Sequence, residues 1–250
     1  MRNVSCIENP TADHTQSDKK IMKRRILLLH GAIGAEDQLQ LLANALKAEG
    51  CDVRIFEFPG HGKRKLYGEI FSIESFAKDV MQWMDRNTMS QLEVFGYSMG
   101  GYVALYIASL YPGYITRITT LGTKFEWTPE IAERETKMLD AEKIEQKVPA
   151  FAKELEQRHT ALGWKKVLAL TADMMLALGD KNVLTEKEFA KVNIPVTVLL
   201  GDSDKMVTRE ETEHAAKNIP GAKFEILENT PHPIEKVNTS SLKAILMRER

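Results

Sequence analysis

Short apolar runs alternate with longer amphipathic stretches along the chain. Runs rich in Ile, Leu and Val and bounded by Gly or Pro occupy residues 25–30, 53–58, 92–97, 115–122 and 195–201. A weaker, more alternating run follows at 223–228. Short apolar runs with these boundaries are typical of strands that are buried on both faces of a parallel sheet.

The stretches between these runs show helical spacing. Residues 36–50 place Leu39, Leu42, Ala43 and Leu46 on one face and end at Gly50, a residue typical of a helix C-terminus. Residues 72–87 open at Ser72 and carry an apolar stripe, and residues 100–113 are apolar and rich in small side chains. Alternation of strand and helix predicts an α/β fold with a doubly wound, mostly parallel sheet of about six strands.

The alternation breaks between the fourth and fifth runs. Residues 124–192 contain no good strand and several helical stretches, and they are too long for a plain loop. We interpret this segment as a helical cap or lid over the strand ends, inserted before the penultimate strand. The α/β core then comprises residues 21–123 and 193–250, and residues 1–20 are expected to form a flexible tail.

Composition excludes several classes of protein. The 250 residues are 43% hydrophobic and 28% charged, with a formal net charge of -1, so no overall field would recruit nucleic acid or an anionic membrane. No apolar run approaches the roughly 20 residues that span a bilayer, and the first 20 residues lack the apolar region of a secretory signal. Cys6 and Cys51 have no disulfide-framework or metal-type spacing. We expect a cytoplasmic protein, monomeric or weakly associating.

One motif points to chemistry. Gly96, Ser98 and Gly100 match the pattern G-x-S-x-G of a nucleophile elbow, in which a strand turns at once into a helix and exposes a strained serine. The helix N-terminus would stabilise negative charge that develops beside the hydroxyl. The motif alone is weak, but here it follows a predicted strand and precedes a predicted helix. Ser98 is therefore the candidate nucleophile, against the alternative of a turn made for packing.

A serine hydroxyl needs a base and an orienting acid, and proteins with this elbow place both after the serine, the acid first. Of the later histidines, His159 lies in the predicted lid and His214 on a charged helix, whereas His232 follows the last strand in a Pro-bounded loop. His232 is the expected base. Asp202 and Asp204 both follow the fifth run and both remain candidate acids, with Glu126 as a third.

Five segments together resemble the α/β-hydrolase superfamily, in its capped serine-hydrolase (esterase- or lipase-like) branch. They are "HG" (30–31), "FPGHG" (58–62), "GYSMGG" (96–101), "GDSDKMV" (201–207) and "PHPIEKV" (231–237). The resemblance covers roughly residues 25–123 and 194–250, with the predicted lid where the family carries its cap domain.

The resemblance implies further roles. The family's acid usually stands three residues after the glycine that ends the strand, which maps to Asp204, with Asp202 as the alternative. Its oxyanion hole would use the backbone N–H groups of Met99 and Ala32. Two departures are the Pro231 before His232, where the family commonly has Gly, and the absence of a hairpin before the first strand.

Other residues have simpler interpretations. His30 is expected to be a structural hydrogen-bonding residue beside the oxyanion loop, and His61 to stabilise its own loop. The basic stretches 19–25 and 62–65 are interpreted as solvated. Side chains proposed to line the substrate pocket are Tyr97, Ile33, Trp164 and Met175. No P-loop, dinucleotide fingerprint or clustered metal ligands occur, so neither a cofactor nor a metal is expected.

These observations predict a serine hydrolase with a Ser98–His232–Asp204 triad. It would cleave a carboxylic ester, thioester or lactone of a small apolar substrate through an acyl-enzyme. Two alternatives stay open: acyl transfer or C–C bond hydrolysis with the same triad, and a non-catalytic ligand receptor on the same fold.

Overall fold

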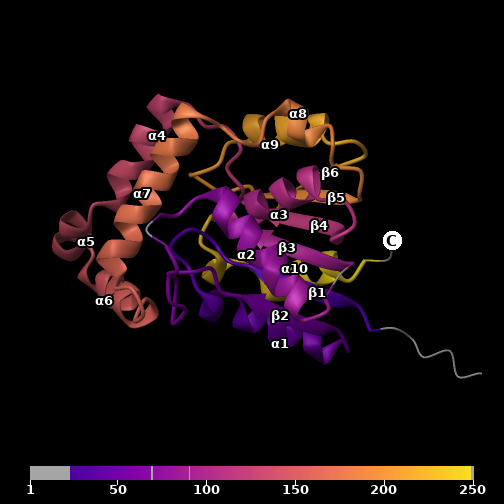
Figure 1. Cartoon of the computed structure of the whole chain (residues 1–250), viewed down its shortest axis with the longest axis horizontal. Coiled ribbons are helices and arrows are strands. Elements are labelled where there is room, and N and C mark those ends of the chain that lie inside the picture. Colours follow the sequence, from indigo (N-terminus) through magenta and orange to yellow (C-terminus); the bar gives the residue numbers. More distant parts are fainter. Residues whose placement is uncertain (1–22, 69, 90, 249–250) are drawn as a thin grey trace, which may run out of the picture.

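A single parallel sheet forms the centre of the molecule (Figure 1). The computed structural model describes residues 23–68, 70–89 and 91–248. Its strands lie in the order β2-β1-β3-β4-β5-β6, and every neighbouring pair is parallel. The strands are β1 (Arg25–Leu29), β2 (Asp52–Phe56), β3 (Leu92–Tyr97), β4 (Ile115–Leu121), β5 (Val196–Gly201) and β6 (Lys223–Leu227). All six apolar runs are confirmed as strands.

Helices cover both faces of the sheet (Figure 1). One layer holds α1 (Gln40–Ala48) and α10 (Thr239–Leu246), and the other holds α2 (Ile73–Arg86), α3 (Met99–Leu110), α8 (Glu186–Phe189) and α9 (Arg209–Asn218). In β1, Ile26 and Leu28 enter the core of the first layer, whereas Leu27 and Leu29 enter that of the second. Because side chains alternate along a strand, one apolar run supplies both cores. The predicted α/β-hydrolase fold is confirmed.

The ends of α2 and α1 show the capping residues that the sequence suggests. Ser72 and Ser75 form a reciprocal capping box at the start of α2. Gly50, with φ of 84°, follows the end of α1 in the left-handed conformation that glycine tolerates best. A 3-10 turn at Glu36–Leu39 precedes α1, and another at Ile234–Lys236 lies between β6 and α10. These turns position the loops that follow β1 and β6.

A group of helices between β4 and β5 stands beside the sheet as a separate lobe (Figure 1). We call residues 129–180 the helical insertion. It contains α4 (Pro129–Thr136), a 3-10 turn (Lys137–Leu139), α5 (Ala141–Lys147), α6 (Pro149–Arg158) and α7 (Trp164–Asp180). The next helix, α8, packs against α3 and α9 on the sheet instead.

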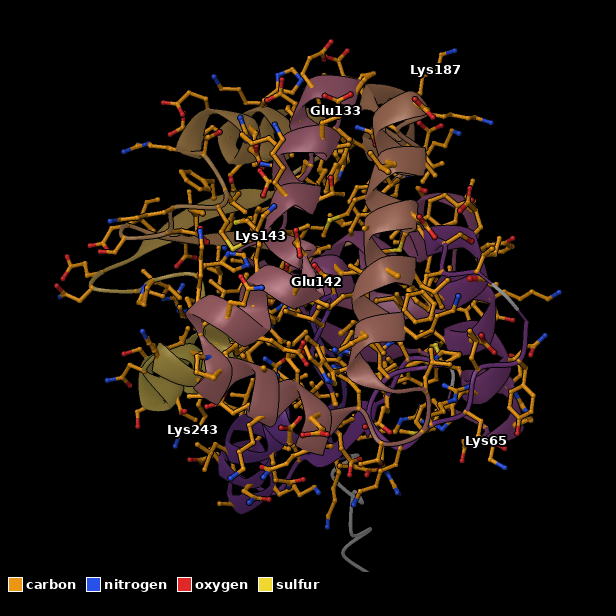
Figure 2. All side chains as sticks on the ribbon, turned by 90° about the vertical axis from the view of Figure 1, so that its left-hand side faces the viewer. Lys65, Glu133, Glu142, Lys143, Lys187 and Lys243 are labelled. Atoms are coloured by element: carbon orange, nitrogen blue, oxygen red, sulfur yellow. The ribbon has the colours of Figure 1, made fainter. Side chains whose placement is uncertain are left out.

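The helical insertion is amphipathic. Glu133, Glu142 and Lys143 project from its outer face toward solvent in Figure 2. Its inner side has a small core of its own, made by Ile144, Ala152, Leu155, Trp164 and Leu168. Further along α7, Val167, Leu170 and Met174 join the main core instead. The insertion is therefore anchored to the α/β core by apolar burial.

In the part of the chain that the structure describes, no helix is long and apolar enough to cross a membrane. The predicted tail at 1–20 and Cys6 lie outside the described residues. Cys51 is a free, buried thiol.

Candidate active site

Ser98 stands at a sharp turn between β3 and α3. Its φ of 51° and ψ of -119° are strained for a residue that carries a side chain. The turn is held by Ser98 N–H, which donates to Leu121 O over 2.9 Å, and by Thr123 Oγ1, which donates to Ser98 O over 3.0 Å. The elbow thus lies against the end of β4.

Three glycines let the backbone approach itself at this turn. A Cβ at Gly96 would lie 2.4 Å from Gly101 Cα, and one at Gly100 would lie 2.3 Å from Leu29 O. A Cβ at Gly101 would meet Thr123 Oγ1 at 2.1 Å. Such contacts are too short for any side chain, so the glycines are required for close packing of β3, α3 and β1.

His232 and Asp204 form a buried pair. His232 Nδ1 lies 2.7 Å from Asp204 Oδ2, and the two side chains are 11% and 2% exposed. The other oxygen of Asp204 accepts the backbone N–H groups of Met206 (2.8 Å) and Val207 (3.0 Å). Burial alone would raise the pKa of Asp204, but the hydrogen bonds from His232 and the two amides outweigh it and lower that pKa. An ionised Asp204 fixes the proton of His232 on Nδ1 and leaves Nε2 free to accept.

The second aspartate has a different position. Asp202 accepts the N–H groups of Asn229 (2.9 Å) and Thr230 (3.0 Å), at the beginning of the loop that carries His232. These hydrogen bonds lower the pKa of Asp202. Asp202 therefore fastens the His232 loop to the end of β5, while Asp204 contacts the imidazole. The third candidate, Glu126, is exposed.

Ser98 and His232 line one cavity of about 60 Å³ beneath the helical insertion. Its walls are mostly apolar, and α7 contributes Met174, Met175 and Leu178. Ala32 and Met99, whose N–H groups are the proposed oxyanion donors, also line it. Within the described residues, neither of these two N–H groups donates a hydrogen bond to the protein.

A charged cluster contributes Lys124 and Glu135 to the wall of the cavity. Lys124 Nζ lies 3.3 Å from Glu211 Oε2 and 3.8 Å from Glu135 Oε1, and it donates to Met206 O over 3.1 Å. Glu135 also accepts from Arg134 at 3.0 Å. Burial raises the pKa of Glu211, although Lys124 acts in the opposite direction. The cluster leaves little uncompensated charge for a substrate.

The residues expected to line the pocket are dispersed. Met175 lines the cavity. Ile33 and Trp164 instead pack in the small core of the helical insertion. Tyr97 is buried on the other side of the elbow, beside His232, and burial raises its pKa. Ile73 at the start of α2 and Trp127 in the 124–127 segment do line the cavity, and no pattern in the sequence indicated this.

The remaining histidines divide into two kinds. His214 is exposed on α9, 3.1 Å from Glu186. His30, His61 and His159 are almost fully buried, and each bonds a backbone carbonyl of the loop after β1. The sequence predicted a hydrogen-bonding role for His30 and a loop-stabilising role for His61, but gave no signal that His159 lies beside them. Among the described residues, no group of three or more His, Cys, Asp or Glu side chains is placed to hold a metal ion.

Comparison with known proteins places the chain in a group of hydrolases. The family model described as serine aminopeptidase, S33, matches residues 20–235. The pimeloyl-[acyl-carrier protein] methyl ester esterase of Neisseria meningitidis is 24% identical over 241 residues, covering 87% of this chain and 91% of that protein. The mouse serine hydrolase BPHL is 24% identical over 218 residues, covering 83% of this chain and 72% of that protein.

A solved structure has the same fold. The enol-lactonase of Burkholderia xenovorans superposes with a TM-score of 0.71 at 17% identity, covering 90% of this chain and 92% of that one.

Proposed function

The chain belongs to the serine aminopeptidase S33 family of the α/β-hydrolase superfamily, and we propose that it hydrolyses a carboxylic ester, thioester or lactone through an acyl-enzyme. The observation that carries the proposal is the arrangement of Ser98 and His232 on one apolar cavity, with Asp204 bonded to His232 from behind. The proposed catalytic residues are these three. An esterase, a serine hydrolase and an enol-lactonase among the similar proteins support the same reaction class.

The first half-reaction forms the acyl-enzyme. Ser98 Oγ attacks the carbonyl carbon of the substrate, and His232 Nε2 takes the hydroxyl proton. The oxyanion that develops is held by the N–H groups of Met99 and Ala32. When the tetrahedral intermediate collapses, the bond from the acyl carbon to the leaving oxygen or sulfur breaks, and the imidazolium gives its proton to that atom. Asp204 stabilises the imidazolium throughout.

The second half-reaction regenerates the serine. Water attacks the acyl carbon, with His232 Nε2 accepting a proton from it. Collapse of this intermediate breaks the bond to Ser98 Oγ, which regains its proton from His232. The products are a carboxylic acid and an alcohol or thiol. A lactone gives one product that carries both the carboxylic acid and the hydroxyl.

The cavity favours a small apolar acyl group. Its volume of about 60 Å³ is well below the roughly 150 Å³ of an engineered protein cavity that holds benzene. The methionines of α7 give its wall an adaptable shape. We therefore expect short acyl chains to be preferred.

An ester is favoured over a peptide with a free amino terminus. A buried ammonium group is costly unless it is paired, most directly by an acidic side chain that has no other partner. The acidic residue that lines the cavity, Glu135, is already paired with Arg134 and lies near Lys124. Alkoxides also leave more readily than amines.

The test compares wild type with Ser98→Ala on p-nitrophenyl esters of increasing acyl length and on aminoacyl p-nitroanilides. We expect wild type to cleave short esters fastest and Ser98→Ala to lose at least about 10³-fold in kcat. Ser109→Ala, at the far end of α3, is the matched control. A fluorophosphonate should label Ser98 in the wild type. The assignment is wrong if Ser98→Ala hydrolyses these esters as fast as wild type.

A further inference from the structure

Three buried histidines that the proposed mechanism does not use surround the loop after β1. His30 follows β1, His61 lies in the loop after β2, and His159 follows α6 in the helical insertion. They are 0%, 0% and 1% exposed. Each imidazole bonds one of three consecutive carbonyls, those of Gly31, Ala32 and Ile33. The loop that carries the proposed oxyanion donor is thus held at three successive peptide groups.

The tautomers of two of these rings follow from their partners. Gly62 N–H donates to His159 Nδ1 over 3.1 Å, so the proton of His159 lies on Nε2 and is donated to Ile33 O over 3.0 Å. Phe58 N–H donates to His30 Nε2 over 3.0 Å, so His30 donates from Nδ1 to Gly31 O over 2.8 Å. His61 Nε2 lies 2.6 Å from Ala32 O and Nδ1 lies 3.2 Å from Pro59 O. A neutral imidazole carries one proton, and the shorter contact assigns it to Nε2.

The hydrogen bond from His159 to Ile33 O is linked to the proposed oxyanion donor, Ala32 N–H, through two peptide groups. Ile33 O and Gly34 N–H belong to one planar peptide. That Gly34 N–H donates to Gly31 O over 3.1 Å, and Gly31 O shares the next planar peptide with Ala32 N–H. Fixing Ile33 O therefore restricts the orientation of Ala32 N–H, which must face the oxyanion. His30 holds the same Gly31 carbonyl from the other side.

The helical insertion makes further contacts at this loop. The side chain of Ile33 packs against the small core of the insertion. Thr171 Oγ1 of α7 lies 3.5 Å from Ala32 O. Ala161 N–H donates to Gly62 O over 3.2 Å, so the segment after α6 is also bonded to the His61 loop. The insertion is therefore part of the support of the loop.

We propose that His159 is a positioning residue for the oxyanion hole: through Ile33 O it holds Ala32 N–H in the orientation that stabilises the tetrahedral intermediate. The inference rests on the proposed function and extends it. The geometry of the oxyanion hole then depends on how the helical insertion packs on the α/β core. His159 touches no substrate. Its contribution is exerted in the transition state and not in substrate binding.

Two substitutions of His159 separate its two hydrogen bonds. In His159→Gln the side-chain amide extends as far as Nε2 and retains a donor for Ile33 O. In His159→Asn the shorter amide can accept from Gly62 N–H but does not reach Ile33 O. Both replacements put a neutral amide at the same buried position. Thr160→Ala, at the exposed neighbouring residue, is the control for the segment.

The measurement is kcat and KM on one short p-nitrophenyl ester, together with Ki for an alkyl boronic acid that forms a tetrahedral adduct with serine. We expect His159→Asn to lower kcat roughly 10–100-fold with KM within about twofold, because a displaced oxyanion donor acts mainly in the transition state. Ki for the boronic acid should rise in proportion to the loss in kcat/KM. His159→Gln should recover most of kcat, and Thr160→Ala should match wild type.

Thermal unfolding of each variant separates positioning from simple destabilisation. Equal kcat in wild type and His159→Asn would overturn the proposal, as would equal losses in the Asn and Gln variants or a loss confined to KM. Failure of the proposed function looks different: wild type itself would then show no hydrolysis that depends on Ser98.

Discussion

The hydroxyl of Tyr97 donates a hydrogen bond of 3.0 Å to the backbone carbonyl of His232. The two rings also lie with centroids 5.5 Å apart. Tyr97 immediately precedes Ser98 in the chain, so the residue beside the proposed nucleophile holds the backbone of the proposed base. The relative placement of the two groups is thereby fixed without contact to substrate.

Tyr97→Phe should lower kcat about fivefold and leave KM unchanged. The phenyl ring keeps the packing, and only one hydrogen bond, worth about 1 kcal/mol, is lost. Steady-state kinetics on a short ester would check this. A rise in KM without a change in kcat would instead indicate contact with the substrate.

Asp204→Asn and Asp202→Asn should differ sharply. Asparagine at 204 can present its NH₂ group to His232 Nδ1 and favour the wrong tautomer of the imidazole. We therefore expect kcat to fall by about 10³–10⁴-fold, the size of the loss when the same aspartate is replaced by asparagine in a Ser-His-Asp triad. Asparagine at 202 keeps one acceptor for the loop amides, and kcat should fall by less than about tenfold. Similar losses in both variants would contradict the separate roles.

Gly122→Ala should impair the Asp204–His232 pair. A Cβ at this position, where φ is 59°, would lie 3.2 Å from both Asp204 Oδ2 and His232 Nδ1. Gly221→Ala is a matched control, because its φ is 68° and no described residue lies within 4 Å of the added Cβ. Both variants should lose about 1 kcal/mol of stability in urea unfolding. Gly122→Ala alone should lose kcat, by about tenfold.

The buried histidines should make folding stability depend on pH. Burial lowers the pKa of His61 to about 4, and it also lowers the pKa values of His30 and His159. Below about pH 6.5 the unfolded chain therefore binds protons that the folded chain does not, so stability is full above that pH and is lost as pH falls toward 4.

Each such histidine contributes a slope of about 1.4 kcal/mol per pH unit in that window. Urea unfolding of wild type and His61→Gln between pH 7 and pH 4.5 would measure it. In the variant, the number of protons taken up on unfolding should be smaller by about one, so its free energy of unfolding should change less with pH. Parallel curves for the two proteins would show that His61 is not held neutral.

Met174→Ala should widen the acyl preference. Met174 is 4% exposed and lines the cavity, so its truncation makes room for further methylene groups. The ratio of kcat/KM for hexanoate over acetate esters should rise about tenfold, since the truncation makes room for about two methylenes and each buried methylene contributes about 0.8 kcal/mol. Leu176→Ala, at an exposed position on the same helix, should leave that ratio unchanged. An unchanged ratio for Met174→Ala would place the acyl group elsewhere.

Local sequence patterns were sufficient for the sheet. All six apolar runs became strands because continuous Ile, Leu and Val stretches bounded by Gly or Pro leave few alternatives. The strand before Ser98 and the apolar helix after it could be predicted from the sequence for the same reason. The choice between Asp202 and Asp204 could not be made from spacing alone, since both follow β5. It depends on how the loop after β6 folds back, which Asp202 itself helps to determine.

Contacts between distant segments were not predictable. His159 lies 126 residues from Ile33, and nothing near it in the chain distinguishes it from a solvated lid histidine. Ile33, in the loop after His30, and Trp164, an apolar residue of the predicted lid, are expected in the pocket from the sequence. The structure instead places Trp164 in the small core of the helical insertion, and Ile33 packs against that core from the α/β side.

The placement of His159 bears on attempts to change specificity by exchanging modules. The helical insertion supplies part of the cavity wall, so grafting a relative's insertion onto this sheet is one route to a new substrate range. Such a chimera would also remove the hydrogen bond to Ile33 O. We expect a graft to need a histidine or glutamine after the helix that corresponds to α6. Without one, the hybrid would bind its new substrate and turn it over slowly.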